Sequence, residues 1–371
     1  MASECSMRAV IQDGIGAPEI LYVRSLPRPG QPTGDQVLIR LRAAGVCYHD
    51  LLVREGTYRQ LVQFPLVPGH EMAGDVLAVG ERVTRIKVGD QVASTNRETC
   101  GQCDLCRSGQ EGICPNQRFF GHNGPGAYAE FALVRENALS VVPRTIPSEA
   151  ACMLSCAIGT ELHAIREVGR VKAGDTVLVT GAGGGLGIHG VQVAKLAGAF
   201  VVGLTSTPAK ASAIRTAGAD AVVTITRGER FDDKLRSVAP NGFDVICDNV
   251  GEAVFASCFR TLAIGGRYVV VGQLNDRSIS FNPAWLLLRN TSLLGSNSST
   301  RKELDDVVKL VDRGLIKPVL DRTMPLEEAA AAHRRVMTAQ ATGRLILASR
   351  FAPTRRRSAA FERGVLDRLA R

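Results

Sequence analysis

Short alternating runs of hydrophobic and polar residues dominate the first part of the chain, and this period of two is typical of half-buried β-strands. Residues 8–11 and 36–41 are predicted strands, and the proline- and glycine-rich residues 27–34 separate them. Two further predicted strands are 74–79 and 90–94. We therefore expect the N-terminal part of the chain to form a mainly β, partly closed barrel.

The pattern changes near residue 150, and from residue 175 onward short apolar runs alternate with segments of helical periodicity. This order is typical of a parallel sheet with crossover helices, and six strands complete a doubly wound dinucleotide-binding sheet. The predicted strands are 175–180, 200–204, 221–225, 243–247, 268–271 and 292–294, followed by helices 302–312 and 327–339 and a last strand 344–347. The expected fold class is α/β, with a Rossmann-type doubly wound parallel sheet domain and a mainly β domain.

A glycine-rich loop joins the first strand of the predicted parallel sheet to a predicted helix at 188–196. Glycines let the backbone approach a pyrophosphate closely, and the free amides at the start of the helix bind the anion. The loop reads G-x-G-x-x-x-G, one residue longer than the usual fingerprint. The candidate cofactor-binding residues in it are Gly181, Gly183, Gly184, Gly185, Leu186 and Gly187.

The segment after the second predicted strand bears on the choice of nicotinamide cofactor. An acid about twenty residues beyond the glycines usually holds the ribose hydroxyls of NAD, and this chain has none there. It has Ser206, Thr207 and Lys210, whose hydroxyls and amine can hold a 2′-phosphate. NADP(H) is therefore the preferred cofactor. If Lys210 only begins the next helix, NAD(H) remains possible.

Length, hydropathy and charge indicate how many domains the chain has and which partners are not expected. A chain of 371 residues predicts two domains. No run of about twenty apolar residues occurs, and residues 1–6 do not resemble a signal peptide, so we expect a cytoplasmic protein with no membrane partner. Of the formal net charge of +9, residues 351–371 contribute six arginines against two acids. This tail could bind an acidic partner, but a solvated terminus is favoured, and nucleic acid is not expected.

Four of the ten cysteines stand in the pattern C-x2-C-x2-C-x7-C. In a reducing compartment such a cluster indicates metal binding rather than disulfides. Four thiolates fill the tetrahedral coordination of Zn²⁺ and leave no open position, so the site is predicted to be structural. Its expected ligands are Cys100, Cys103, Cys106 and Cys114. The alternative is a reduced lobe without metal.

A second set of candidate zinc ligands begins with Cys47 and His70. A zinc ion that does chemistry keeps one position open and needs three protein ligands. Cys156 is the candidate for the third ligand, and Cys152 is less favoured. A single buried cysteine is more often a small hydrophobic residue than a ligand, so the prediction depends on the whole motif.

Residues 69–80, Gly-His-Glu-Met-Ala-Gly-Asp-Val-Leu-Ala-Val-Gly, resemble the zinc signature of the medium-chain dehydrogenase/reductase family, which includes the zinc alcohol dehydrogenases. The resemblance extends over nearly the whole chain, from about residue 7 to about residue 349. It implies two Zn²⁺ ions per chain, one catalytic and one structural, and a homodimer or homotetramer joined through the dinucleotide domains. It also implies that Glu71 is an alternating zinc ligand and that Asp50 hydrogen-bonds His70.

The family's domain organisation gives the expected boundaries. These are a GroES-like catalytic domain at 1–155 with a zinc lobe at about 95–115, a Rossmann domain at 156–296, a return segment at 297–350 that completes the catalytic domain, and the basic tail at 351–371. Thr160 and Gly272 are further candidate cofactor-binding residues.

His49 is the main departure from the family pattern, which commonly has Ser or Thr there to accept the substrate proton. An imidazole can accept a proton near neutral pH, so His49 is a candidate proton relay; the alternative is a hydrogen-bonding residue beside the zinc. The family's outer relay histidine would fall at Leu52, so a longer relay is not expected. The histidines without motif support are His122, His163, His189 and His333.

Three functions remain open. The leading hypothesis is a zinc-dependent alcohol dehydrogenase or aldehyde reductase that transfers hydride between NADP(H) and a small-molecule substrate. The second is an NADPH-dependent enoyl-thioester reductase, because residues 183–189 and the pair Cys47-Tyr48 resemble acryloyl-CoA-type reductases. The third is a cofactor-binding protein without enzymatic activity, which would have little need for a three-ligand metal site.

Overall fold

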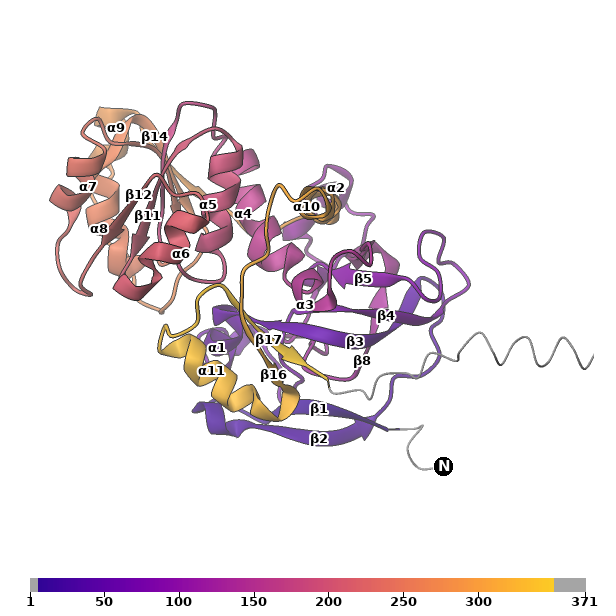
Figure 1. The fold of residues 1–371 in the computed structure, drawn as a ribbon. Helices are drawn as coiled ribbons and strands as arrows, with labels where there is room; N and C mark the ends of the chain where they lie inside the picture. The colour runs from indigo at the N-terminus through magenta and orange to yellow at the C-terminus, as the bar shows by residue number, and fades with distance from the viewer. Residues whose placement is uncertain (1–5, 350–371) are drawn as a thin grey trace, which may run out of the picture.

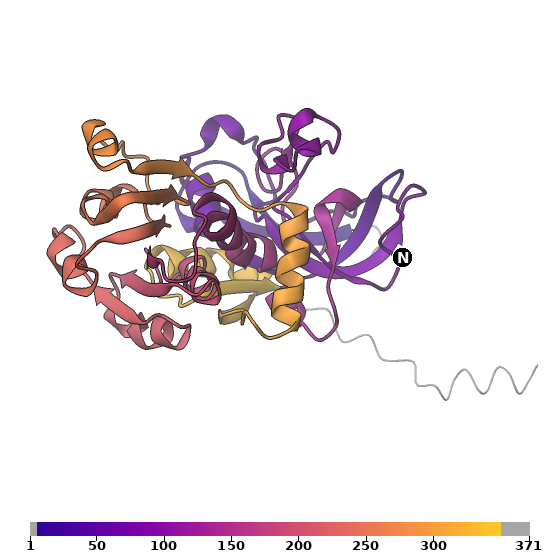
Figure 2. The same ribbon diagram turned by 90° about the horizontal axis from the view of Figure 1, so that it is seen from above.

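The computed structural model describes residues 6–349. These residues form two lobes, one built on a parallel β-sheet with helices on both faces and one built on a mainly antiparallel sheet (Figure 1). Helix α10 (Arg301–Asp312) lies between the lobes, as the view from above also shows (Figure 2). Among the described residues, no helix has the length and apolar character needed to cross a membrane.

The parallel sheet has six strands in the order β12-β11-β10-β13-β14-β15. All neighbouring strands in it are parallel, and the order reverses beside β10, as in doubly wound dinucleotide-binding folds. The strands are β10 (Thr176–Val179), β11 (Phe200–Thr205), β12 (Ala221–Thr224), β13 (Phe243–Asp248), β14 (Leu262–Val270) and β15 (Ser292–Gly295). The predicted fold class is confirmed, although β14 begins earlier than the predicted strand at 268–271.

Helices cover both faces of this sheet because its strands are apolar on both sides. Val177 of β10 packs in the same core as Val191 of α5, whereas its neighbour Leu178 packs in the core that contains Leu235 of α7. This alternation follows from the period of two along a strand. The helices are α5 (Gly187–Leu196), α6 (Ala211–Thr216), α7 (Asp232–Val238), α8 (Glu252–Arg260) and α9 (Ala284–Arg289).

The second lobe is a seven-stranded sheet in the order β16-β17-β3-β4-β5-β9, with β8 also paired to β3. Only the β16–β17 pair in it is parallel. The strands are β3 (Gln36–Val46), β4 (Glu71–Val79), β5 (Gln91–Ser94), β8 (Phe131–Arg135), β9 (Leu139–Val141), β16 (Leu320–Pro325) and β17 (Arg344–Ala348), with short ribbons of β1 (Ser6–Gln12) and β2 (Leu21–Pro27) and of β6 (Arg97–Glu98) and β7 (Arg118–Phe119). The last strand therefore pairs with one of the first.

A helical stretch between residues 148 and 168 joins the two sheets and was not predicted. Every residue from 151 to 162 in it is buried, so its sequence lacks the polar face that gives an amphipathic helix its period. It comprises α3 (Ser148–Ala151), the π-helical turn η5 (Leu154–Gly159), α4 (Thr160–Leu162) and the π-helical turn η6 (His163–Val168). The remaining helices are α1 (Tyr48–Glu55), α2 (Asp104–Arg107), η3 (Glu111–Ile113) and α11 (Ala329–Met337), with further short turns elsewhere.

Candidate metal and cofactor sites

Four thiols gather in the lobe that contains α2 and η3. The Sγ–Sγ distances are 3.9 Å for Cys100–Cys106, 3.9 Å for Cys103–Cys114 and 3.6 Å for Cys100–Cys114. A tetrahedral zinc with Zn–S bonds of about 2.3 Å sets its sulfur ligands roughly 3.8 Å apart. The backbone amides of Gln102 and Cys103 lower the pKa of Cys100 to about 6, which favours its thiolate, whereas burial raises the pKa of Cys106 to about 12. These four residues therefore fit a closed tetrahedral zinc site.

A second, buried cluster consists of Cys47, His70, Glu71 and Cys156, whose ligand atoms all lie within 4.8 Å of one another. Cys47 is the N-cap of α1, His70 directly precedes β4, Glu71 is the first residue of β4, and Cys156 lies in η5. The sulfur atoms of Cys47 and Cys156 are 4.0 Å apart although 109 positions separate the residues. Two thiols, an imidazole and a carboxylate form a donor set that suits zinc.

The alternative third ligand, Cys152, is not in this cluster. Its thiol donates to the carbonyl of Glu149 at 3.4 Å, and burial raises its pKa well above the usual range. The Cys47 thiol and burial raise the pKa of Cys156 as well, so the position of the sulfur atom, and not its pKa, separates the two cysteines. The geometry therefore favours Cys156.

Asp50 orients the imidazole of His70. The Asp50 Oδ1–His70 Nδ1 distance is 2.8 Å, which leaves His70 Nε2 to face the cluster. The other carboxylate oxygen accepts hydrogen bonds from the Cys47 amide at 2.9 Å and the Tyr128 hydroxyl at 3.0 Å. Burial would raise the pKa of Asp50, but His70 outweighs it and leaves that pKa below the usual range. Asp50 is therefore an anion held by three partners.

Glu71 in the cluster is paired with Arg344, for which no role was predicted from the sequence. Arg344 is the first residue of β17, and its Nη2 lies 3.0 Å from Glu71 Oε1 and 3.9 Å from the sulfur of Cys156. Within residues 6–349, neither carboxylate oxygen of Glu71 accepts a hydrogen bond. Burial raises the pKa of Glu71 to about 7, against the lowering effect of Arg344. A buried carboxylate without hydrogen bonds beside two thiols fits a site for a cation.

Beside the cluster, His49 forms a pair with His122. Their Nε2 atoms are 2.8 Å apart and their rings are parallel, with centroids 4.9 Å apart and an interplanar angle of 4°. One ring must donate and the other accept, so each fixes the tautomer of its partner. Burial is the main cause that lowers the pKa of His49 well below its usual range and that of His122 to about 4. His122 had no motif, and only the fold brings it to this site.

The glycine loop between β10 and α5 is close-packed at several points. Gly181 has a φ of +59°, which favours glycine, and a Cβ on Gly187 would lie 2.5 Å from the Gly181 carbonyl oxygen. A Cβ on Gly185 would lie 2.7 Å from Nη1 of Arg344, so this arginine covers the loop as well as the donor cluster. No side chain caps the start of α5, where the amides of Ile188 and His189 donate to the carbonyls of Gly184 and Leu186 at 3.2 and 2.8 Å. The glycines of the loop still let a pyrophosphate approach the backbone closely. The loop therefore fits a pyrophosphate.

Three of the other predicted cofactor residues closely follow the carboxyl ends of parallel strands. Ser206 and Thr207 follow β11, and Gly272 follows β14, where its amide donates to the Asp248 carbonyl at 3.0 Å. Thr160 is buried at the start of α4. Lys210 is buried against Gly183, and its amine donates to the carbonyl of Ala341 in the return segment. The lysine therefore already has a partner.

Comparisons with known proteins agree with this fold. Residues 33–144 match the family model described as alcohol dehydrogenase GroES-like domain, and residues 185–313 match the model described as zinc-binding dehydrogenase. An acryloyl-coenzyme A reductase of Sulfurisphaera tokodaii is 33% identical over 86% of this chain and 93% of its own. An NAD-dependent alcohol dehydrogenase of Saccharolobus solfataricus is 33% identical over 92% of this chain and 99% of its own. The crystal structure of AibC superposes with a TM-score of 0.87 at 38% identity, and covers 94% of this chain and 98% of that one.

The GroES-like lobe and the Rossmann-type parallel sheet define an oxidoreductase of the class whose family model is described as zinc-binding dehydrogenase. The chain belongs to the medium-chain dehydrogenase/reductase family, and it is an alcohol dehydrogenase-like oxidoreductase. The family resemblance predicted from residues 69–80 is therefore confirmed.

Proposed function

We propose that this protein is a zinc-dependent enzyme that transfers a hydride between NADP(H) and an alcohol–aldehyde or alcohol–ketone pair. The observation that supports this most is the position of Arg344, which contacts Glu71 in the donor cluster at 3.0 Å and covers Gly185 of the glycine loop. Hydride transfer requires reacting atoms within about 3.5 Å of each other. A cofactor whose pyrophosphate lies on this loop can therefore extend its nicotinamide toward the donor cluster, where the substrate would bind.

In this proposal Cys47, His70 and Cys156 hold the catalytic zinc, and Glu71 is an alternating ligand. When bound, zinc supplies Lewis acidity at the substrate oxygen and the nicotinamide accepts or donates the hydride. Asp50 keeps the His70 ring turned with Nε2 toward the cluster. The four cysteines of the other lobe hold the structural zinc.

His49 is the proposed acceptor of the alcohol proton. Its ring is neutral at neutral pH because burial lowers its pKa, which leaves a nitrogen lone pair free but makes the ring a weaker base than an exposed histidine. Its Nε2 lies 2.8 Å from His122 Nε2, so a proton on His49 can pass to a second imidazole. In the direction of carbonyl reduction the same pair returns the proton to the substrate oxygen.

The preference for NADP(H) is proposed from the end of β11. The residues there are Thr205, Ser206 and Thr207, so no carboxylate repels a 2′-phosphate. The amine of Lys210 donates to Ala341, and a 2′-phosphate would have to compete with that carbonyl. NAD(H) remains the alternative cofactor, and the ratio of kcat/KM for the two cofactors decides between them.

The test of the proposed reaction is NADPH oxidation with two substrates side by side, a simple aromatic aldehyde and crotonyl-CoA. Faster turnover of the aldehyde, and its loss on treatment with a zinc chelator while NADPH still binds, is the expected result. Turnover of the aldehyde that survives complete removal of zinc would contradict the proposal.

The second candidate function is reduction of an enoyl thioester, and it is favoured by the acryloyl-coenzyme A reductases at 33% and 34% identity. In that reaction hydride adds to the activated C=C bond and a proton is delivered to the carbon next to the thioester carbonyl. Faster turnover of crotonyl-CoA than of the aldehyde in the same assay would establish it. A cofactor-binding protein without activity would turn over neither.

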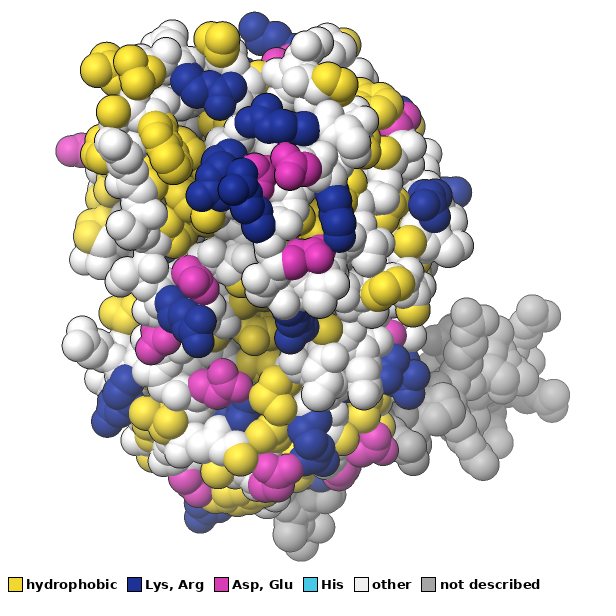
Figure 3. All heavy atoms as spheres, turned by 90° about the vertical axis from the view of Figure 1, so that its left-hand side faces the viewer, with side chains coloured by type: hydrophobic (Ala, Val, Ile, Leu, Met, Phe, Trp, Pro, Cys, Tyr) yellow, Lys and Arg dark blue, Asp and Glu magenta, His cyan; other side chains and the backbone are white. Residues whose placement is uncertain are grey.

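We also propose that the chain forms a homodimer or homotetramer through its dinucleotide domain. Strand β15 is an edge of the parallel sheet, and the preceding helix α9 exposes Leu287 and Leu288 by 81% and 78%. Figure 3 shows hydrophobic side chains between arginines and lysines on the outer face of this lobe. Exposed apolar residues beside an open sheet edge are typical of a contact surface.

A further inference from the structure

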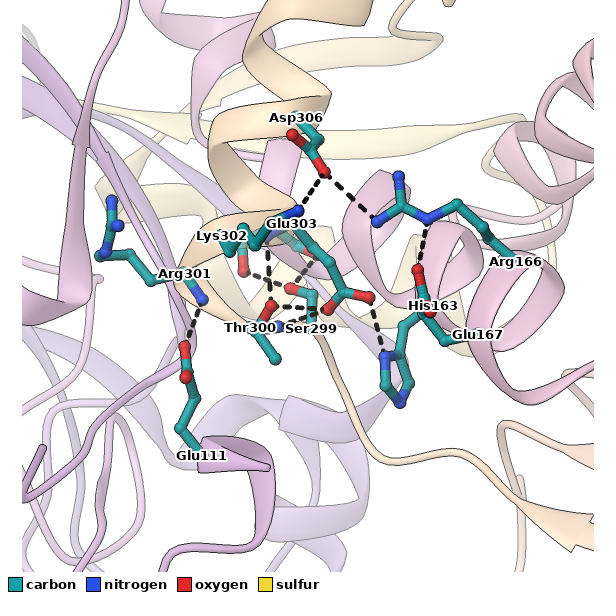
Figure 4. Close-up of polar contacts among 11 residues, drawn as sticks. Glu111, His163, Arg166, Glu167, Ser299, Thr300, Arg301, Lys302, Glu303 and Asp306 are labelled. Atoms are coloured by element: carbon teal, nitrogen blue, oxygen red, sulfur yellow. Dashed lines mark hydrogen bonds and ion pairs between the residues drawn. The ribbon is translucent and has the colours of Figure 1, made fainter. Parts of the chain in front are cut away.

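The four-cysteine lobe contacts the first residue of α10 through Glu111. The carboxylate of Glu111, three residues before Cys114, accepts a hydrogen bond of 2.7 Å from the backbone amide of Arg301 (Figure 4). Amides in the first turn of a helix have no partner within the helix, and a carboxylate there is favoured by the helix dipole as well. The four-cysteine lobe therefore supplies a charge-assisted cap to α10, the helix that lies between the parallel sheet and the mainly antiparallel sheet.

A second contact between the lobe and the same segment involves the buried Arg97. Its guanidinium donates to the carbonyl of Gly112 and to Gln117 Oε1 at 2.6 Å, and reaches Asn297 Oδ1 at 3.2 Å. The Asn297 amide in turn donates to Gly112 at 3.4 Å. Residues 297–301, which follow β15 and lead into α10, are thus attached to the lobe at both ends.

Ser299, in the middle of this segment, contacts Ser155, the residue before Cys156 of the second cluster. Ser299 Oγ lies 3.0 Å from Ser155 Oγ and donates to the Ser155 carbonyl at 3.1 Å. Both serines are buried, and Ser155 directly precedes Cys156. The approach is close: a Cβ on Gly159 would lie 2.8 Å from Ser299 Oγ. The backbone that carries Cys156 is therefore held by a residue that lies between Asn297 and Arg301.

The start of α10 is also attached to the far end of the same helical stretch. Thr300 and Glu303 form a reciprocal capping box, and the Glu303 carboxylate accepts from His163 Nδ1 at 2.8 Å (Figure 4). Cys156 in η5 and His163 in η6 are thus both held by residues 299–303. The position of α10 and the position of Cys156 depend on each other.

We propose that Glu111 is a positioning residue that couples the four-cysteine lobe to the placement of Cys156, through residues 297–301. The proposal rests on the two metal sites of the proposed function. The contacts from Glu111 to Arg301, along the backbone to Ser299, and from Ser299 to Ser155 form one continuous path, which is the physical condition for coupling. Weakening the attachment of the lobe to α10 frees Cys156 to move, and the second cluster then releases its zinc faster.

The experiment measures zinc release to a colorimetric chelator from the purified, zinc-loaded protein and its variants. The phase that belongs to the second cluster is identified by its absence in Cys47→Ser. In Glu111→Ala this phase is expected to be about tenfold faster, the effect of losing one charge-assisted hydrogen bond, while the lobe keeps its zinc. Glu111→Gln retains a hydrogen-bond acceptor, so its release rate should lie between those of the unmodified protein and Glu111→Ala. The matched control is Asp104→Ala, which removes an exposed carboxylate from the same lobe.

Ser299→Ala tests the same path without touching the lobe. It should also accelerate the second phase, and the effects of Glu111→Ala and Ser299→Ala should be less than additive because both act through one segment. Equal release rates in Glu111→Ala and Asp104→Ala, or acceleration of the lobe phase only, would overturn the proposal. If Glu111→Ala cannot be loaded with zinc, unchanged second-phase release in Ser299→Ala overturns it.

Failure of the underlying metal assignment is distinguishable from failure of the coupling. An unmodified protein that holds one zinc per chain, with no phase lost in Cys47→Ser, would contradict the proposed catalytic site. An unmodified protein that holds two, with release rates unaffected by Glu111 and Ser299, would contradict only the coupling.

Discussion

Glu161 is a fully buried carboxyl group in the helical stretch that joins the two sheets. The Cys247 thiol donates to its Oε2 at 3.1 Å, and its Oε1 has no hydrogen-bond partner within residues 6–349. Room for it exists because the facing residue is Gly190, where a Cβ would lie 2.6 Å from the carboxylate. Burial raises its pKa to about 7. The group is therefore a proton-binding site that the unfolded chain lacks at neutral pH.

Replacing Glu161 by Gln should stabilise the protein at alkaline pH and have little effect at pH 5. The folded state binds the proton more tightly than the unfolded state, so stability falls as pH rises from about 4.5 to about 7. At pH 8 the buried, ionised Glu161 lowers the free energy of unfolding by on the order of 3 kcal/mol. The measurement is the free energy of unfolding by urea at several pH values, with the exposed Glu328→Gln as control. Equal pH profiles for Glu161→Gln and the unmodified protein would contradict this account.

A second prediction at this scale separates the two metal sites. Cys47→Ser should reduce the zinc content by one equivalent and abolish turnover, because it removes a ligand from the three-ligand site. Cys103→Ser should also lose one equivalent but chiefly lower stability, because a structural zinc contributes to folding. Metal analysis and thermal unfolding of both variants provide the check. Two equivalents retained in Cys47→Ser would show that this cysteine is not a ligand.

At the scale of elements, the start of α10 depends on a few side chains. Thr300 Oγ1 accepts from the Glu303 amide at 3.1 Å, and Glu303 Oε2 accepts from the Thr300 amide at 2.7 Å. Thr300→Ala removes one half of this box and should cost about 1 kcal/mol of stability. The control is Thr216→Ala, an exposed threonine near the end of α6. Urea unfolding that gives the same loss for both variants would mean that the box contributes nothing specific.

The strands and the four-cysteine cluster were visible in the sequence because both are local patterns, whereas the second set of candidate ligands spans residues 47–156 and was proposed from the resemblance of residues 69–80 to a family signature. Alternation marked β3 and β4, and close spacing marked the four cysteines of the zinc lobe. His122 and Arg344 were missed because their contacts span 73 and more than 270 positions and carry no motif. A charged residue at the start of the apolar strand β17 was the one available signal for Arg344. The helical stretch around Cys156 was missed because burial on all sides removes its period.

At the scale of the whole molecule, α9 exposes Leu287 and Leu288 by 81% and 78% among the residues that the structure describes. Replacing Leu287 and Leu288 together by lysine should convert the expected oligomer to a monomer, because two charges cannot be buried in an apolar contact. The check is the mass in solution by light scattering. The control is Leu61→Lys, a residue 62% exposed on the other lobe. An unchanged mass in the double variant would place the contact elsewhere.

The pairing of β17 with β3 also affects the order in which the two sheets can fold during synthesis. Residues 345–348 complete the sheet that residue 36 begins, whereas the parallel sheet is contiguous from residue 176 to residue 295. A chain emerging from the ribosome therefore has all of the parallel sheet available while β3 still lacks β17 on one side. Because long-range pairs form last, we expect the parallel sheet to fold first and the N-terminal sheet to be completed only after residues 345–348 have been synthesised.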